Sequence, residues 1–347
     1  MEFHQLAIQS LQKLTPDSIE ITFKVPAELS AQFAFKAGQY VTLDMDGARR
    51  DYSLCSSPLD GEWSIGVKAV SDGFVSKFLN SEVKVGDFLK VSTPNGRFGI
   101  PSKPDEKRTI LAFAAGSGIT PILSVLRYTL QTEKWVNFYL FYANKTPETT
   151  MFHQEIEQLK QEFEGNFHPY LFYTQTKMDD WFFEGRLDAQ KFKLIINQLV
   201  DINEVDEALV CGPNEMIEVI TEEIFQAGII KERIHFELFT PKEMEEEKVI
   251  EKTLKTVEVT VELDGEVTTV EWNTDLNLVD ALNNQGIDAP YSCKGGICST
   301  CLCRLEEGEV DLKENYILTD ADLEDKLILA CCTLPKSDKI RINFDEV

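Results

Sequence analysis

Hydrophobic and polar positions alternate along the first hundred or so residues, in short segments separated by glycine, proline and aspartate. Alternation at every second residue is the pattern of a strand with one buried face. The pattern predicts strands at Ser18–Val25, Tyr40–Asp44, Trp63–Val70 and Phe88–Ser92, and a short helix at Phe74–Asn80. Many short strands in so little chain favour an antiparallel β-barrel.

The pattern changes near residue 105, where apolar runs begin to alternate with amphipathic helical stretches. The expected strands are Thr109–Ala115, Val136–Ala143, Phe167–Thr174 and Glu207–Cys211. The expected helices begin after Thr120 and span Met151–Phe163 and Glu215–Gln226. This α/β alternation predicts a parallel sheet covered on both faces. Such sheets bind ligands at the carboxyl ends of their strands.

The last third of the chain has a third pattern. Thr256–Leu263 and Val267–Trp272 alternate around an Asp-Gly pair, which predicts a hairpin, and a helix is expected near Asp280–Gln285. The stretch before them is a charge run that predicts a solvated linker, with a short helix as the alternative. The expected domains are residues 1–104, 105–240 and 254–347, with the linker at 241–253.

Composition narrows the class of protein. The 347 residues are 43% hydrophobic and 27% charged, and the net charge is −25. Nucleic acid is not an expected partner, because phosphate binding requires clustered Lys and Arg. Residues 241–347 hold 25 acidic and 11 basic residues, a net charge of −14, which suits docking to a basic partner.

Targeting signals are also absent from the pattern. No apolar run is long enough to span a bilayer, and the first residues lack the basic and apolar regions of a signal peptide. We therefore expect no membrane association and a cytoplasmic location. The eight cysteines are then expected to be reduced thiols or metal ligands.

Four cysteines carry the most specific signal in the sequence. Cys293, Cys298, Cys301 and Cys331 follow the spacing Cys-x4-Cys-x2-Cys-x29-Cys, which is the ligand pattern of a plant-type [2Fe–2S] cluster. Two glycines between the first two ligands, at positions 295 and 296, let the backbone bend closely around the inorganic core. The sequence therefore predicts a one-electron carrier within this chain.

Other uses of these cysteines fit less well. Structural zinc sites usually take two Cys-x2-Cys pairs, and disulfides require an oxidising compartment. Cys303 has the same facing as Cys301 on an alternating strand, but the spacing gives it no ligand role. Cys332 directly follows a ligand, and the Leu-Ala-Cys context favours Cys331 as that ligand.

Two motifs in the first block suit a flavin dinucleotide. Arg50 and Tyr52 lie on one face of an expected strand, where a guanidinium suits a pyrophosphate and a phenol suits a flat ring. Ser53 follows and is able to donate to a ring nitrogen. Gly73 and Ser76 lie at the start of the expected helix, whose free N–H groups suit phosphate. The plain alternatives are a surface pair and an ordinary helix-capping turn.

The second block has signals for a nicotinamide dinucleotide. A buried strand ends in two glycines and enters a helix with proline near its first turn, through Gly116, Gly118, Thr120 and Pro121. Cys211, Gly212 and Pro213 follow a later strand, and Glu237 and Phe239 close the block. The alternatives are a simple turn for the former group and a core position for Phe239. Lys145, where an acid would select NAD, favours NADPH unless it is merely solvated, and NADH stays possible.

These motifs together resemble the ferredoxin–NADP⁺ reductase superfamily, in its oxygenase-reductase branch with a C-terminal plant-type ferredoxin domain. The motifs occur in the family's order along essentially the whole chain. Within the branch, the chain is similar to the subfamily of phenylacetyl-CoA epoxidase reductase subunits. The local matches are Cys293-Lys-Gly-Gly-x-Cys298, Asn315-Tyr316, and Asn144-Lys145-Thr146 followed by Met151-Phe152.

The resemblance implies an FAD-binding barrel, an α/β nicotinamide domain and an α+β ferredoxin domain of the β-grasp type. It implies that Arg50, Tyr52 and Ser53 hold the isoalloxazine and adjoining phosphate. By the same resemblance Gly73 and Ser76 hold the pyrophosphate, and Gly116, Gly118 and Thr120 lie along the nicotinamide dinucleotide. Ser53, Cys211 and Glu237 are the implied catalytic residues. Phe239 stands where some relatives have tyrosine, and Cys332 where many have glutamine.

The expected function is an NADPH-dependent reductase that passes electrons through FAD and a [2Fe–2S] cluster to an oxygenase component. The resemblance implies a phenylacetyl-CoA epoxidase as that component. A reductase for another aromatic-ring, Rieske or di-iron hydroxylase is the alternative of the same class. A ferredoxin-type electron carrier whose upstream domains are scaffolding is the alternative of another class.

Overall fold

The computed structural model describes residues 2–71, 73–239, 256–313 and 315–347. The chain divides into two compact units, an N-terminal unit of Glu2–Phe239 and a C-terminal unit of Thr240–Val347 with Met1. The linker expected at 241–253 lies outside the described residues. No helix in the described ranges is long and apolar enough to cross a membrane.

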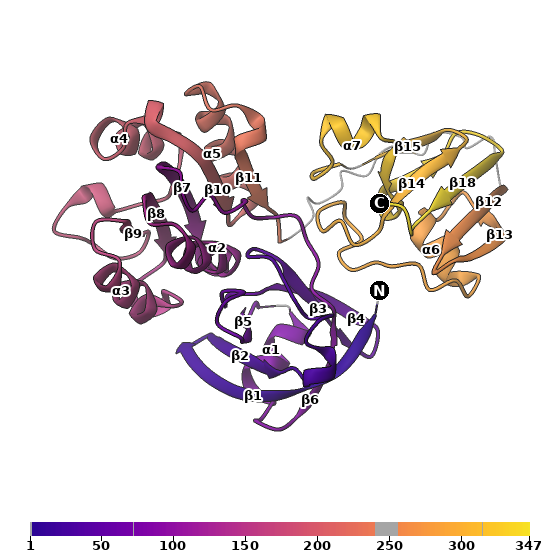
Figure 1. The fold of residues 1–347 in the computed structure, drawn as a ribbon, viewed down its shortest axis with the longest axis horizontal. Helices are drawn as coiled ribbons and strands as arrows, with labels where there is room; N and C mark the ends of the chain where they lie inside the picture. The colour runs from indigo at the N-terminus through magenta and orange to yellow at the C-terminus, as the bar shows by residue number, and fades with distance from the viewer. Residues whose placement is uncertain (1, 72, 240–255, 314) are drawn as a thin grey trace. The chain divides into compact units, whose positions relative to one another are not determined.

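The N-terminal unit begins with a six-stranded antiparallel sheet (Figure 1). Its strands in spatial order are β4 (Ala48–Ser53), β3 (Tyr40–Met45), β6 (Phe88–Ser92), β1 (Phe3–Thr15), β2 (Ser18–Lys24) and β5 (Trp63–Lys68), and helix α1 is Phe74–Ser81. Ile19, Ile21 and Phe23 alternate into the core along β2. A bridge between Leu54 and Ile65 joins the two edges, so the sheet closes as a barrel.

The same unit continues with a five-stranded parallel sheet covered by helices. The strands in spatial order are β11 (Ile234–Glu237), β10 (Val205–Cys211), β7 (Arg108–Ala115), β8 (Val136–Asn144) and β9 (Phe167–Tyr173). The helices are α2 (Ile119–Thr132), α3 (His153–Glu162), α4 (Ala189–Gln198) and α5 (Asn214–Gln226). Figure 1 shows α2 and α3 on one face and α4 and α5 on the other. Strand β7 is buried almost throughout, as two covered faces require.

The C-terminal unit is an α+β domain built on a five-stranded sheet. Its strands in spatial order are β13 (Glu266–Asn273), β12 (Thr256–Leu263), β18 (Lys339–Asn343), β14 (Leu302–Glu307) and β16 (Leu327–Leu329). A small second sheet pairs β15 (Val310–Leu312) with β17 (Thr333–Pro335), and the helices are α6 (Leu278–Asn284) and α7 (Asp320–Glu324). Trp272 is fully buried and donates its indole N–H to the Leu276 carbonyl at 2.8 Å.

The predicted fold class is confirmed in all three parts, and two local details are informative. The predicted hairpin turn is present: Asp264 and Gly265 both have positive φ, at 54° and 75°, as a two-residue turn of this kind requires. The helix expected from Met151 begins later, at His153. Phe152 precedes it in the left-handed region, at φ 58°, and its ring packs beside Gly66 of the barrel.

Candidate redox site

One hydrogen bond joins the two sheets of the N-terminal unit at the residues expected to be catalytic. Ser53 is buried at the end of β4, and its hydroxyl donates to Oε2 of Glu237 at 2.8 Å. Glu237 is the last residue of β11 and pairs in register with Cys211, the last residue of β10. The fold therefore brings together three residues that are far apart in the sequence.

The environment keeps both titratable members of this group neutral. Burial raises the pKa of the Glu237 carboxyl to about 8, although the Ser53 hydrogen bond lowers it. Burial also raises the pKa of the Cys211 thiol well above its ordinary value, and a charge on Glu237 would raise it further. Near neutral pH this corner therefore holds a protonated carboxyl and a thiol, with no net negative charge.

The turn after β7 lies against the same corner. Gly116–Gly118 forms a 3₁₀ turn, η2, that leads directly into α2. A Cβ on Gly118 would lie 2.2 Å from the carbonyl oxygen of Cys211, so the two chain segments touch through their backbones. Gly116 has φ 55°, and nothing lies within 4 Å of where its Cβ would be. The turn therefore packs closely on one side and faces open space on the other.

The remaining nicotinamide residues surround this turn. Thr120 and Pro121 are buried in the first turn of α2, and the Thr120 hydroxyl donates to the Ser117 carbonyl at 3.0 Å. Gly212 is tightly packed, since a Cβ there would lie 2.6 Å from Cε of Met216. Pro213 is exposed as the cap of α5. Lys145 is exposed just past the end of β8.

The flavin residues expected from the sequence lie along β4 and at the start of α1. Arg50 is exposed, and Tyr52 is half-buried, which raises the pKa of its phenol to about 12. Gly73 caps α1. Ser76 is buried, and its hydroxyl accepts from the Val70 N–H and donates to the Gly73 carbonyl, both at 3.2 Å. The Ser76 hydroxyl thus shapes the turn, and the free backbone N–H groups of α1 are what suit a phosphate.

Two residues at this site were missed by the sequence analysis. The hydroxyl of Tyr142, in β8, donates to the Gly116 carbonyl at 2.9 Å and so anchors the turn. Gly66, in β5, packs so closely on Thr120 that an added Cβ would lie 2.7 Å from its Cγ2 atom. A tyrosine near a strand end and a glycine inside a strand were the available signals. Phe239 is 41% exposed, so it is not a core residue.

The four expected cluster ligands come together in the C-terminal unit. Cys293 and Cys298 are half-buried, Cys301 and Cys331 are buried, and the Cys293 thiol interacts with those of Cys298 and Cys331. The backbone N–H of Gly295 points to Sγ of Cys293 and that of Cys331 to Sγ of Cys301, both at 3.4 Å. N–H groups aimed at sulfur stabilise thiolates, so these residues fit a [2Fe–2S] cluster.

The loop that carries three of these cysteines is tightly bent and anchored. Lys294 and Ser299 have positive φ, at 52° and 55°, and Gly296 has φ 73°. The Lys294 ammonium pairs with Asp280 of α6 at 2.6 Å and lies 4.4 Å from the centre of the Tyr291 ring. These contacts anchor the bent loop to α6 and to the Tyr291 ring.

The positions of these side chains also bear on two alternatives, a structural zinc site and a ligand role for Cys303 or Cys332. Among the described residues, no group of three or more His, Cys, Asp or Glu side chains is placed to hold one metal ion. In a [2Fe–2S] cluster each iron takes only two protein ligands, so such a site does not require three or four side chains around one ion. Cys303 is fully buried in β14, and Sγ of Cys332 lies 3.5 Å from Sγ of Cys331.

Comparisons with known proteins agree with this architecture. Three families match in order: the oxidoreductase FAD-binding domain over residues 5–100, the oxidoreductase NAD-binding domain over 113–222, and the 2Fe-2S iron-sulfur cluster binding domain over 261–336. One subunit of the 1,2-phenylacetyl-CoA epoxidase of Escherichia coli K12 is 34% identical over 99% of this chain and 98% of its own. The ferredoxin reductase component of 3-ketosteroid-9-alpha-monooxygenase from Rhodococcus rhodochrous is 33% identical over 98% and 96%.

Solved structures show the same fold. Phthalate dioxygenase reductase superposes with a TM-score of 0.60 at 24% identity, over 99% of this chain and 98% of its own. An intact type IV self-sufficient cytochrome P450 monooxygenase gives a TM-score of 0.71 at 22% identity. The match covers 98% of this chain and 41% of that longer one.

Proposed function

The chain belongs to the family of oxygenase reductases that join FAD-binding, NAD-binding and [2Fe–2S] domains, and we propose that it carries electrons from NADPH to a separate oxygenase component. Bound FAD would supply the conversion between a hydride, which carries two electrons, and the single electrons that an iron–sulfur cluster carries. We place the domain boundaries at 1–104, 105–240 and 254–347, with the linker at 241–253, a division that the ranges of the family matches support.

The observation that carries the proposal is the hydrogen bond between Ser53 and Glu237. It lies where the barrel meets the carboxyl end of the parallel sheet, which is where the flavin and nicotinamide rings would have to meet. Ser53 would orient the flavin ring, and the buried thiol of Cys211 would lie against the nicotinamide. Because the Glu237 carboxyl is largely protonated near neutral pH, it adds no negative charge beside a site that receives a hydride.

The other residues of the two cradles have binding roles in this proposal. Arg50 and Tyr52 would hold the flavin and its phosphate, with the Gly73–Ser76 turn on the pyrophosphate. Gly116, with open space beside its α-carbon, would let the nicotinamide dinucleotide approach the backbone. Gly118, Thr120, Pro121, Gly212 and Pro213 shape the rest of that cradle, and Phe239 would cover the flavin edge.

We propose NADPH as the preferred donor because Lys145 is exposed at the end of β8, where the adenosine ribose of a dinucleotide would lie. The test is the rate of flavin reduction with NADPH and with NADH, for the wild type and for Lys145→Glu. We expect the wild type to favour NADPH and the variant to lose that preference by about tenfold or more, since one ion pair to a phosphate is replaced by a repulsion. An unchanged preference would remove Lys145 from the proposal.

Cys293, Cys298, Cys301 and Cys331 would hold the cluster from which electrons leave the chain. Iron and acid-labile sulfide in the purified protein test this directly, and flavin in the same sample tests the barrel. We expect Cys298→Ser to keep the reduction of a dye by NADPH and to abolish delivery to the oxygenase. Delivery that persists in Cys298→Ser would contradict the proposed route.

The proposed acceptor is the oxygenase part of a phenylacetyl-CoA epoxidase, supported by the relative at 34% identity. A steroid monooxygenase component is the second candidate, because its reductase is 33% identical over nearly the whole chain. The acidic C-terminal unit suits an acceptor with a basic docking face. NADPH-driven turnover with each purified oxygenase separates the two, and failure with the epoxidase would reject the first candidate.

A further inference from the structure

Helix α2 presents a row of polar side chains to the barrel. Thr120, Ser124, Arg127 and Gln131 are spaced by four, three and four residues, so they lie on one face of the helix. Ser124 is fully buried, and its hydroxyl donates to the Ser56 carbonyl at 2.7 Å. This polar row, which begins directly after the Gly116–Gly118 turn, is therefore a contact between the nicotinamide-binding sheet and the barrel.

Arg127 is at the centre of the contact. Its Nη2 atom lies 2.7 Å from Oδ2 of Asp60, in a loop of the barrel, and its Nη1 atom donates to Oε1 of Glu155 in α3 at 2.8 Å. Gln131 donates to Oδ1 of Asp60 at 3.0 Å, and the Ser57 N–H donates to Oδ2 at 2.7 Å. The Arg127 guanidinium thus connects α2 and α3, which cover the same sheet, to Asp60 of the barrel. The Asp60 carboxylate is itself held in place by Gln131 and Ser57.

Short segments of chain connect this contact to both cofactor cradles. The Ser56–Asp60 loop begins three residues after Ser53, the flavin residue at the end of β4. On the other side, α2 is continuous from Gly118 to Arg127. A change in the Arg127 contacts would therefore move the barrel loop and the dinucleotide turn relative to each other.

An apolar core also spans the two halves of the unit. Ala37, Cys55 and Phe98 of the barrel belong to the same buried cluster as Ile119 and Ile122 of α2. Apolar packing is non-directional, so it holds the halves together without fixing their angle. The planar guanidinium of Arg127 bridges two carboxylates, and its hydrogen bonds are directional, so it fixes both distance and direction.

We propose that Arg127 is a positioning residue for hydride transfer, which sets the orientation of the flavin-binding barrel against the nicotinamide-binding sheet. The inference rests on the proposed reductase function. A displacement of about 1 Å between reacting groups costs on the order of 100-fold in rate. Loss of the Arg127 contacts should therefore slow flavin reduction far more than it weakens dinucleotide binding.

The charges around Arg127 make the contact sensitive to pH. Burial raises the pKa of Glu155 to about 7, the Arg127 charge lowers it, and the Glu20 and Asp60 charges raise it. The pKa of Glu20, in β2, is itself raised by burial, and its carboxylate accepts a hydrogen bond from the Cys55 thiol at 3.6 Å. Above about pH 7 Arg127 faces an ionised Glu155, and below it that partner is neutral. The tie between α2 and α3 therefore weakens as the pH falls through about 7.

The experiment is anaerobic stopped-flow reduction of the flavin by NADPH in the full-length protein, over a range of NADPH concentrations. For Arg127→Met, which keeps the apolar stem, we expect the limiting rate constant to fall about 10- to 100-fold. The NADPH dissociation constant should change less than about threefold, because Arg127 lies at the barrel side of α2 and not at the dinucleotide turn. Arg127→Lys should lie between the wild type and Arg127→Met, since a lysine keeps the charge but lacks the fixed planar geometry of the guanidinium.

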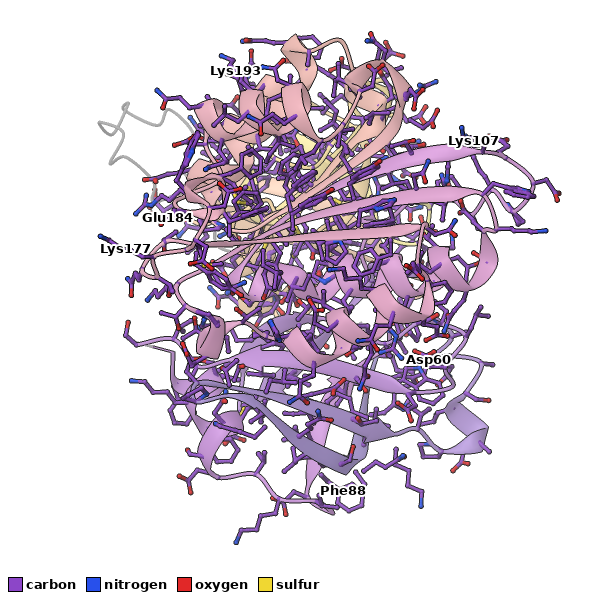
Figure 2. The ribbon with its side chains drawn as sticks, turned by 90° about the vertical axis from the view of Figure 1, so that its left-hand side faces the viewer. Asp60, Phe88, Lys107, Lys177, Glu184 and Lys193 are labelled. Atoms are coloured by element: carbon purple, nitrogen blue, oxygen red, sulfur yellow. The ribbon has the colours of Figure 1, made fainter. Side chains whose placement is uncertain are left out.

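Lys193→Met is the matched control. It removes an ion pair between Lys193 and Glu223, 3.2 Å long, that joins α4 to α5 within the parallel-sheet domain. Figure 2 shows Lys193 near the top of the view, whereas Asp60 lies well below it, where the barrel meets the helices. We expect this variant to reduce its flavin at the wild-type rate.

The pH profile gives a readout that a merely structural role would not move. The wild-type rate should show an inflection near pH 7 that Glu155→Gln removes, while a step from Glu237 near pH 8 persists. Flavin content and melting temperature confirm that each variant is folded. A wild-type rate in folded Arg127→Met, or a loss confined to NADPH affinity, would overturn the inference. No reduction of the wild type by either NADPH or NADH would instead overturn the proposed function itself.

Discussion

Substituting Gly118 by alanine should destabilise the N-terminal unit more than its backbone angles suggest. Gly118 has φ −61°, a conformation that alanine adopts without strain. The added methyl would, however, lie 2.2 Å from the Cys211 carbonyl oxygen, 2.5 Å from its carbon and 2.8 Å from the Gly212 nitrogen. All three atoms belong to the backbone of the strand end, so no side chain is able to rotate away.

The magnitude follows from this contact and from its comparison with Gly116. Inserting a methyl into a packed site costs about 1–3 kcal/mol, and we expect the upper end because the η2 turn must move away from β10 as a whole. Gly116→Ala places its methyl in open space, and only the left-handed φ of 55° opposes it, at about 1–2 kcal/mol. Gly118, which has the ordinary φ, should thus be more sensitive to alanine substitution than Gly116.

The measurement is differential scanning calorimetry of the full-length protein, in which we expect the two compact units to unfold in separate transitions. For a unit of this size, about 3 kcal/mol lowers the melting temperature by about 6–12 °C. Gly116→Ala should lower it by about a third to two thirds as much, and the transition of the C-terminal unit serves as an internal reference. A melting temperature within about 2 °C of the wild type for Gly118→Ala would refute the reasoning, because it would mean that the turn and the strand end separate freely.

Three further outcomes are expected. Cys331→Ser should lose the iron and acid-labile sulfide of the purified protein, whereas Cys332→Ser should keep both, since the Leu-Ala-Cys context favours Cys331 as the ligand and its backbone N–H points to Sγ of Cys301. Burial raises the pKa of Glu237 from 4.5 in the unfolded chain to about 8 in the folded chain, so its contribution to stability is fully present below pH 4.5 and is lost as the pH rises to about 8. The drop in melting temperature between pH 5 and 8 should therefore be smaller in Glu237→Gln. Arg108→Met should cost about 3–5 kcal/mol in urea unfolding, because it removes one partner of a buried ion pair, in which Nε of Arg108 lies 2.7 Å from Oε2 of Glu133, and leaves the other partner buried.

Much of the architecture could be predicted from the sequence because its signals are local. Strand β12 alternates Val257, Val259 and Val261 into the core, which indicates a sheet with one buried face. Strand β7 is a continuous apolar run, which indicates a sheet covered on both faces. The hairpin turn was equally predictable, because Asp264-Gly265 is a residue pair that favours such turns. Strand β11 and helix α4 were not predicted. The start of α3 was misplaced because Phe152 takes a left-handed φ of 58°, which no local pattern of the sequence indicates.

The sequence by itself determined the cluster spacing, the glycine turn after β7 and the order of the three domains, since each depends on residues within a short stretch of chain. Only the tertiary structure decided which of these residues meet. Ser53 reaches Glu237 across 184 positions, and Arg127 reaches Asp60 across a domain boundary. Such pairs leave no periodic trace, because their partners are set by how the sheets and helices pack and not by the spacing of neighbouring side chains.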